Sequence, residues 1–300
     1  MANTGTCHEP IGFTNQEAGS HGTFSFIKMH GCGNDYIYFD CFAREIAEPH
    51  VLARRLSDRN KGVGGDGIIL ILPSQEADAT MRMFNADGSE SGMCGNAIRC
   101  VGKYLYESGR VTKTHMDIET LSGVKSLELG IFEGEVTAVR VDMGAARLLP
   151  TDIPVSLPGD SVIGREVTVS NQKHEITCVS IGNPHAVIFH EDIDHFDLDI
   201  VGPMFQKATI FPEKINLEVA QIVSRNNLRM RVWERGTGET MACGTGACAV
   251  AVAATLMGYC DKDTDIQVQV KGGVLTIRYT DETIYMTGDC VKVFEGTIVA

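Results

Sequence analysis

The feature that most constrains this chain is a block of sequence that occurs twice. Residues 84–105 read "FNADGSESGMCGNAIRCVGKYL", and residues 233–254 read "WERGTGETMACGTGACAVAVAA". The two blocks align without a gap at an offset of 149 residues, which pairs Glu90 with Glu239, Cys94 with Cys243 and Gly95 with Gly244. Each block follows a strand-like run and opens a helix-like run. The chain is therefore predicted to consist of two related halves.

The remainder of the chain is rich in strand-like segments. Apolar and polar residues alternate with a period of two, and glycine or Asp-Gly turns separate the runs. We predict strands that include residues 24–30, 36–40, 68–72, 80–84, 135–143, 175–181, 228–233, 266–271 and 274–279. Helices are expected at residues 49–57, 96–108, 198–207 and 244–258. This order of elements is typical of an α+β fold and not of a βαβ alternation.

The two helices that follow the repeated blocks differ in polarity. Residues 244–258 are apolar on every face, so this helix is expected to be buried all round, surrounded by sheet. Residues 96–108 are more amphipathic, with an apolar stripe made of Ala97, Ile98, Val101 and Leu105. We therefore expect two pseudo-symmetric, β-barrel-like halves, each wrapped around a central helix. The two helix N-termini would face each other across a cleft.

Composition excludes several classes of function. The net charge of −13 disfavours non-specific binding to nucleic acid. No apolar run reaches membrane-spanning length, and residues 1–23 read as a mobile polar tail without the features of a secretory signal. We therefore expect a cytoplasmic protein. None of the ten cysteines is spaced as Cys-x-x-Cys, so a zinc ribbon is disfavoured and most thiols should be buried and free.

One glycine motif, "GVGGDG" at residues 62–67, matches the dinucleotide-binding pattern only formally. That site needs a strand before the glycines and a helix after them. Here the following residues, "IILILP", read as a strand. We interpret the glycines as a tight turn in which backbone segments approach closely.

The paired cysteines suggest a chemistry. A thiol at a helix start lies near the positive end of the helix dipole, which is expected to lower its pKa. The free N–H groups of the first turn can bind a carboxylate. Two such sites facing one carbon could remove a proton from one face and deliver another to the opposite face, which is racemisation or epimerisation. One cysteine would start as thiolate and the other as thiol. Cys100 and Cys248 do not match at the offset and are assigned to the core.

From about Phe24 to the C-terminus, the sequence resembles the diaminopimelate epimerase family. The resemblance rests on "KMHGCGNDY", "DRNKGVGGDG", "FNADGSESGMCGNAIRC", "IGNPHAV", "FPEKINLE" and "ERGTGETMACGTGA", in family order. It implies an isomerase of lysine and peptidoglycan precursor biosynthesis that interconverts LL- and meso-diaminopimelate without cofactor or metal. It also implies a homodimer without nucleic-acid or membrane partners. Implied domains are residues 24–141 with 288–300, and residues 142–287.

The resemblance also assigns roles to residues. Cys94 and Cys243 would be the acid/base pair. The carboxylate of the reacting centre would be bound by Gly95, Asn96, Gly244 and Thr245. The distal end of the substrate would be held by Asn34, Asn85, Asn183, Asn216 and Arg235, while Glu234 and His185 would lie near the catalytic centre. Cys32 stands where the family more often has an aliphatic residue, so its thiol could be mistaken for a catalytic one.

Three alternatives remain at this point. Another cofactor-free racemase of the same fold, such as a histidine racemase, would keep both cysteines and change the distal residues. A phenazine-biosynthesis-like isomerase would lack the cysteine pair. A thiol redox or metal-binding protein would need a second cysteine near each Cys-Gly turn, which this sequence does not provide.

Overall fold

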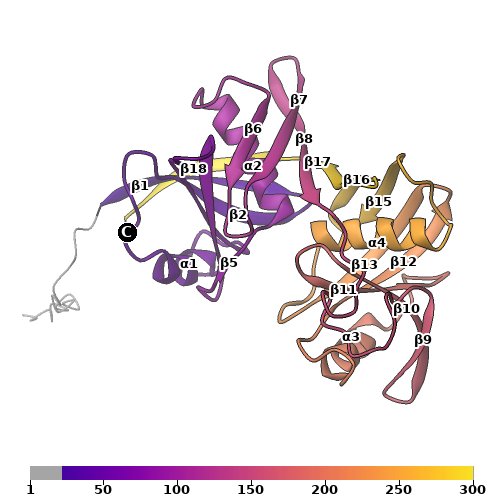
Figure 1. Cartoon of the computed structure of the whole chain (residues 1–300). Coiled ribbons are helices and arrows are strands. Elements are labelled where there is room, and N and C mark those ends of the chain that lie inside the picture. The colour runs from indigo at the N-terminus through magenta and orange to yellow at the C-terminus, as the bar shows by residue number, and fades with distance from the viewer. Residues whose placement is uncertain (1–21, 300) are drawn as a thin grey trace, which may run out of the picture.

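The computed structural model describes residues 22–299 (Figure 1). The tail expected over residues 1–23 therefore lies outside the described residues as far as residue 21, and Thr23 already begins the first strand. In Figure 1 two halves lie side by side, and the last strand, drawn in yellow, runs back into the first half.

The first half contains two helices within a strand-rich body. Its elements are β1 (Thr23–Gly31), β2 (Asn34–Asp40), α1 (Pro49–Ser57), β3 (Gly67–Leu72), β4 (Ala79–Asn85), β5 (Glu90–Ser91), α2 (Gly95–Glu107), β6 (His115–Glu119), β7 (Lys125–Phe132), β8 (Glu135–Gly144) and the returning β18 (Val291–Val299). The strand that follows the "GVGGDG" turn is β3, so the expectation that no helix follows these glycines is confirmed.

The second half repeats this order. Its elements are β9 (Arg165–Val169), β10 (Gln172–Ser180), β11 (Pro184–Phe189), α3 (Leu198–Lys207), β12 (Asn216–Ser224), β13 (Asn227–Glu234), β14 (Gly238–Glu239), α4 (Gly244–Leu256), β15 (Asp265–Val270), β16 (Gly273–Tyr279) and β17 (Ile284–Gly288). The helices predicted at 49–57 and 198–207 are α1 and α3, and those predicted at 96–108 and 244–258 are α2 and α4.

The internal repeat is confirmed at the level of strand pairing. Helices α2 and α4 both begin and end 149 residues apart. The parallel pair β2–β3 aligns Tyr36 with Gly67, and the parallel pair β11–β12 aligns His185 with Asn216 at the same offset. Pairs β3–β4 and β12–β13 are antiparallel in both halves, again with matching register. The two halves are therefore copies of one topology.

Two strands join the halves. Strand β8 pairs with β7 of its own half and with β17 of the other, so the two sheets are continuous there. After β17 the chain returns to the first half, where β18 pairs antiparallel with β1. In the second half β9 occupies the corresponding place beside β10. The short segment between β17 and β18 therefore passes the junction of the two halves.

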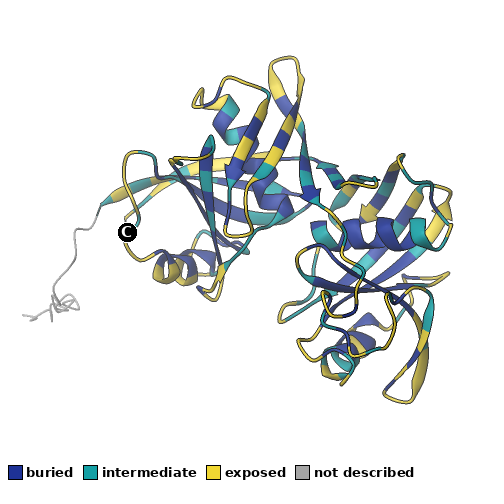
Figure 2. Ribbon diagram, viewed as in Figure 1, coloured by how far each residue is buried: buried dark blue, intermediate teal, exposed yellow. Residues whose placement is uncertain are grey.

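Each half packs its sheet around one helix. Helix α4 contacts strands β10 to β13 and β15 to β17, and residues from Gly244 to Ala254 are almost all buried (Figure 2). Helix α2 contacts β1, β2, β7, β8 and β17, and its predicted stripe of Ala97, Ile98, Val101 and Leu105 is wholly buried. The predicted arrangement of two strand-rich halves around central helices is confirmed.

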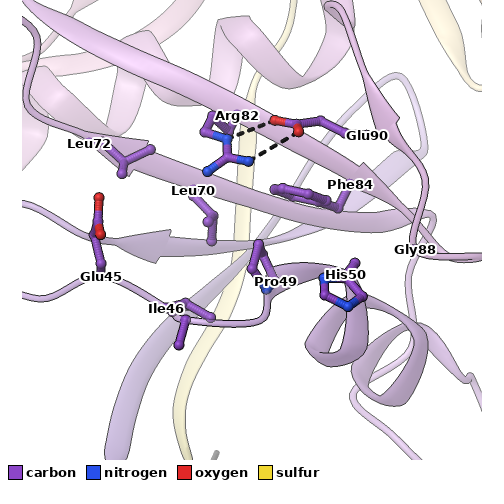
Figure 3. A pocket seen from close by; sticks show the side chains of 11 residues that line it. Glu45, Ile46, Pro49, His50, Leu70, Leu72, Arg82, Phe84, Gly88 and Glu90 are labelled. Carbon is purple, nitrogen blue, oxygen red and sulfur yellow. Dashed lines mark hydrogen bonds and ion pairs between the residues drawn. The ribbon is translucent and has the colours of Figure 1, made fainter.

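Helix α1 covers the opposite face of the first sheet, packing on β3 and β4. A cavity of about 470 Å³ opens beside its start and is lined by Pro49, Leu70 and Phe84, with the Arg82–Glu90 ion pair at its rim (Figure 3). The alternate strand residues Ile69 and Met83 pack instead into the core around α2. This cavity therefore lies on the other side of the sheet from the repeated cysteines.

Candidate active site

Cys94 and Cys243 occupy the same position in the two halves. Each is the N-cap of a central helix and has extended backbone geometry, with φ −129° and ψ 120° at Cys94 and φ −119° and ψ 110° at Cys243. The Cys243 sulfur accepts a hydrogen bond from the Gly246 N–H at 3.3 Å, as a capping side chain does. The Cys94 thiol donates to Asn34 Oδ1 at 3.2 Å.

The two helix starts lie against each other. Helices α2 and α4 are in contact. A Cβ atom at Gly95 would lie 2.5 Å from Met286 Cε, and one at Gly244 would lie 2.9 Å from Met286 Sδ, so a side chain at either position would collide with the same methionine. The Asn96 Nδ2 group donates to Ala242 O at 3.4 Å. Glycine after each cysteine thus allows the two cysteine turns to approach around one side chain.

Two asparagines at the repeat offset lie beside the cysteine turns. Asn34 Oδ1 accepts from Asn96 Nδ2 at 3.3 Å in addition to the Cys94 thiol. Asn183 Nδ2 donates to Thr245 Oγ1 at 3.2 Å, and that hydroxyl lies 3.4 Å from the Cys243 sulfur. The structure therefore brings Asn34 and Asn96 to Cys94, and Asn183 and Thr245 to Cys243.

The second half adds a buried polar pair. His185 Nδ1 lies 2.7 Å from Glu218 Oε1, and His185 Nε2 lies 2.9 Å from Asn183 Oδ1. Both side chains of the His185–Glu218 pair are 0% exposed. The first half has Tyr36 and Ile69 at these positions. Sequence reasoning missed Glu218, although an acidic residue within the apolar run "NLEVA" was a signal that could have found it.

Glu234 lies at the end of β13, close to both cysteines. Its Oε1 accepts from Thr240 Oγ1 at 2.5 Å. Burial raises the pKa of the Glu234 carboxyl, the Glu218 charge raises this pKa further, and the Thr240 hydrogen bond partly opposes the increase. The Glu234 charge raises the pKa of Cys94 and of Cys243, which places this carboxyl near both thiols.

The expectation that the helix starts lower both thiol pKa values is wrong. Burial raises the pKa of Cys94, and this outweighs the opposing effect of the N–H groups of Ala97 and Asn96. Burial also raises the pKa of Cys243 well above its usual value, with added contributions from the charges of Glu234 and Glu218. Desolvation dominates because a thiolate loses more solvation than two amide dipoles return.

The residues expected at the distal end have separate contacts. Asn34 and Asn183 bond to the cysteine turns, as described above. Asn216 Oδ1 accepts from the Arg235 N–H at 2.8 Å, and Arg235 Nη1 donates to Glu213 O at 3.1 Å, so these two residues lie together. Asn85 donates to Ser89 Oγ at 3.0 Å within its own turn. The guanidinium of Arg235 is partly exposed and has further donors available for a carboxylate.

The other cysteines have structural surroundings. Cys32 is wholly buried, and its thiol donates to Asp289 Oδ1 at 3.3 Å. Burial raises the pKa of Cys32 to about 12. Cys100 and Cys248 are wholly buried within α2 and α4, as expected for core residues. Among residues 22–299, no group of three or more His, Cys, Asp or Glu side chains is arranged to hold a metal ion. No helix in this range is long and apolar enough to cross a membrane.

The chain is similar in sequence to one protein family over most of its length. The family described as diaminopimelate epimerase matches residues 26–149 and 177–293. A protein of Methanococcus maripaludis named diaminopimelate epimerase is 50% identical over 275 residues, covering 91% of this chain and 99% of its own length. A protein of the same name from Desulfovibrio desulfuricans is 52% identical over 279 residues, covering 90% and 96% of the two chains.

Solved structures at low identity share the fold. A phenazine biosynthesis protein of the PhzF family from Bacillus anthracis superposes with a TM-score of 0.68 at 18% identity, covering 93% of this chain and all of its own. A hydroxyproline epimerase from Agrobacterium vitis, bound to trans-4-hydroxy-L-proline, gives a TM-score of 0.67 at 13% identity and covers 92% of both chains. At these identities the likeness concerns the α+β architecture alone.

Proposed function

The chain belongs to the diaminopimelate epimerase family, and from this we propose that it interconverts LL- and meso-2,6-diaminopimelate by a two-base reaction of Cys94 and Cys243. It is an isomerase. The observation that carries the two-base assignment is the placement of one cysteine at the start of each central helix, with the two helix starts in contact. A single base at one helix start would need no such duplication.

In this proposal the α-carboxylate of the reacting centre binds to the N–H groups that open the two helices. Gly95 and Asn96 contribute from α2, and Gly244 and Thr245 contribute from α4. The α-carbon then lies between the sulfurs. One thiolate removes the α-proton, and the opposite thiol donates its proton to the other face. The reverse reaction exchanges the two roles.

The charges around the thiols suit an amino-acid substrate. Because burial raises the pKa of both cysteines, an ammonium group beside the sulfur favours the thiolate that the reaction requires. Glu234 and His185 are proposed to bind near this centre, and their positions beside Thr240 and Asn183 support that assignment. The α-ammonium of diaminopimelate supplies the positive charge.

The distal amino-acid end is proposed to be held by Arg235 together with Asn34, Asn85, Asn183 and Asn216. Arginine binds a carboxylate through two parallel donors, and asparagine offers both a donor and an acceptor for a neighbouring ammonium group. The contact between Asn216 and the Arg235 backbone supports a joint role for these two residues.

Domain boundaries, cellular location, pathway and oligomeric state are also proposed. We propose domains of residues 24–141 with 288–300 and of residues 142–287, a cytoplasmic location, and a role in lysine and peptidoglycan precursor biosynthesis. The free state of the nine cysteines within residues 22–299 is typical of a reducing compartment. We also propose a homodimer, because the exposed apolar side chains of Val291, Val293 and Phe294 along β18 offer a surface for a second copy.

The function is tested by incubating the protein with LL-diaminopimelate in deuterated water without added cofactor. We expect deuterium at one α-carbon and formation of the meso isomer, measured by mass spectrometry and chiral chromatography. Exchange on histidine or proline, with none on diaminopimelate, would reject the substrate assignment and retain racemase chemistry. Absence of exchange on all three amino acids would reject the function itself.

Changing Arg235→Lys is expected to weaken binding of diaminopimelate by about 1–3 kcal/mol, because a point charge cannot reproduce two parallel hydrogen bonds to a carboxylate. The measurement is the dissociation constant from calorimetry. Arg231→Lys is the matched control, since Arg231 lies on β13, the strand that Arg235 directly follows, and is paired with Glu239. The Arg231→Lys variant should have a lower melting temperature and an unchanged dissociation constant for diaminopimelate. Unchanged affinity in Arg235→Lys would mean that the distal carboxylate is held elsewhere.

A further inference from the structure

Arg99 is a wholly buried cation on α2, one turn after the Cys94 position. Burying a charge costs several kcal/mol unless it is well paired. The nearest carboxylate oxygen, Asp289 Oδ1, is 3.8 Å from Arg99 Nη2, which is beyond hydrogen-bond distance. The guanidinium is held chiefly by neutral acceptors instead. The ion pair with Asp289 is therefore a long one, and the close hydrogen bonds of the guanidinium go to neutral acceptors.

The internal repeat shows that the fold does not need a cation here. At the offset of 149 residues, Arg99 corresponds to Cys248 of α4, which is also wholly buried. Two glycines, one at the end of β1 and one at the end of β17, make room for the guanidinium. A Cβ atom at Gly31 would lie 2.7 Å from Arg99 Nη2, and one at Gly288 would lie 2.9 Å from Arg99 Cζ. The surroundings are thus fitted to an arginine in one half only.

The contacts of Arg99 lead to both cysteine turns. Its Nη1 donates to Asn96 Oδ1 at 3.0 Å, and its Nε donates to Asp289 O at 2.9 Å in the segment between β17 and β18. Because arginine only donates hydrogen bonds, the Asn96 oxygen must face it, and the Asn96 amino group must face away. That amino group donates to Asn34 Oδ1, which accepts the Cys94 thiol, and to Ala242 O, next to Cys243.

We propose that Arg99 is a positioning residue, which fixes the Asn96 amide so that it holds the two cysteine turns at the separation that proton transfer requires. Its contact with the β17–β18 segment connects the same amide to the junction of the halves. The inference rests on the proposed function for its kinetic effect. Misplacing reacting groups by about 1 Å can cost on the order of 100-fold in rate.

The test compares Arg99→Met with Lys103→Met. Methionine keeps much of the arginine volume and removes the donors. Lys103 is the matched control, because it is a buried cation one turn further along α2, and its Nζ donates to Glu107 and to Val136 O, away from the cysteine turns. We expect Arg99→Met to lower kcat by about 100-fold with a smaller change in KM. The Lys103→Met variant should have a lower melting temperature than wild type and an unchanged kcat.

A double mutant separates positioning from a general effect on folding. If Arg99 acts through Asn96, adding Arg99→Met to Asn96→Ala should cost little more than Asn96→Ala alone. Additive losses in kcat, or a kcat for Arg99→Met within about threefold of wild type, would overturn the proposal. So would equal kcat losses in Arg99→Met and Lys103→Met.

A second readout does not depend on the substrate. Freeing the Asn96 amide should change the hydrogen bonding of Asn34 and so expose the Cys94 thiol. We expect iodoacetamide to alkylate Cys94 about 2–10 times faster in Arg99→Met than in wild type, measured by peptide mapping, with no change in Lys103→Met. An unchanged alkylation rate would contradict the inference. If the wild-type protein catalyses no deuterium exchange on diaminopimelate, that result would instead contradict the proposed function.

Discussion

Replacing either Cys94 or Cys243 with alanine is expected to reduce epimerisation by at least about 10²–10⁴-fold, the range contributed by one general acid or base. Each cysteine serves one face of the α-carbon, so neither can substitute for the other. The measurement is the rate of meso isomer formation from LL-diaminopimelate, together with the melting temperature of each variant to show that it is folded.

Cys100→Ala and Cys248→Ala are the matched controls. These thiols are wholly buried one to two turns further along the same helices, and alanine there removes packing without removing a proton donor. Both controls should lose some stability and keep the chemistry. Near-normal turnover in Cys94→Ala or Cys243→Ala would contradict the two-base assignment. A loss of turnover in both controls that equals the loss in the site variants would do the same.

The architecture could be predicted because the sequence contains an internal repeat, so that each half supports the interpretation of the other. The gapless match around Cys94 and Cys243 fixes a strand, a turn and a helix in each half, and the structure places α2 and α4 at that same offset. The all-round apolar composition of residues 244–258 predicts burial on every face, since no polar side chain could direct one face to water. Strong periodicity and a repeat are local signals, so they can be read without knowing the tertiary contacts.

The thiol pKa direction could not be predicted in the same way. The helix start is a local feature, whereas burial depends on how closely the two halves pack around Met286. The expected effect of the Asn96 and Ala97 N–H groups on the pKa of Cys94 is present, but desolvation is larger. For Cys243 the charges of Glu218 and Glu234 add to burial in raising the pKa, and neither carboxyl adjoins the cysteine in sequence.

Arg99 shows the same limit for side-chain placement. In the helical pattern it falls beside the apolar stripe of α2, where an arginine ordinarily extends to solvent. It is buried because Gly31 and Gly288, both distant in sequence, leave space for its guanidinium. A helical periodicity identifies the face of a helix but not the cavity that another strand provides. Functional residues that depend on such cavities emerge only from the packed structure.

Hydrogen peroxide is expected to inactivate the protein by linking Cys94 to Cys243, with activity restored by dithiothreitol. One thiolate attacks peroxide to give a sulfenic acid and hydroxide. The second thiol then attacks the sulfenic sulfur, which forms the disulfide and releases water. The contact between the helix starts and the Asn96–Ala242 hydrogen bond keep the two turns together. A disulfide requires the two α-carbons to come within about 7 Å.

The rate of this inactivation should rise with pH between about 7 and 9, because the thiolate reacts with peroxide and burial raises the pKa of both cysteines. Diaminopimelate should protect, since it occupies the space between the sulfurs. Peptide mapping of the oxidised protein identifies the linked residues. Cys32 should remain reduced, because it is wholly buried and its thiol is bonded to Asp289. Oxidation that maps to Cys32, or that dithiothreitol cannot reverse, would mean that the two helix-start sulfurs do not face each other.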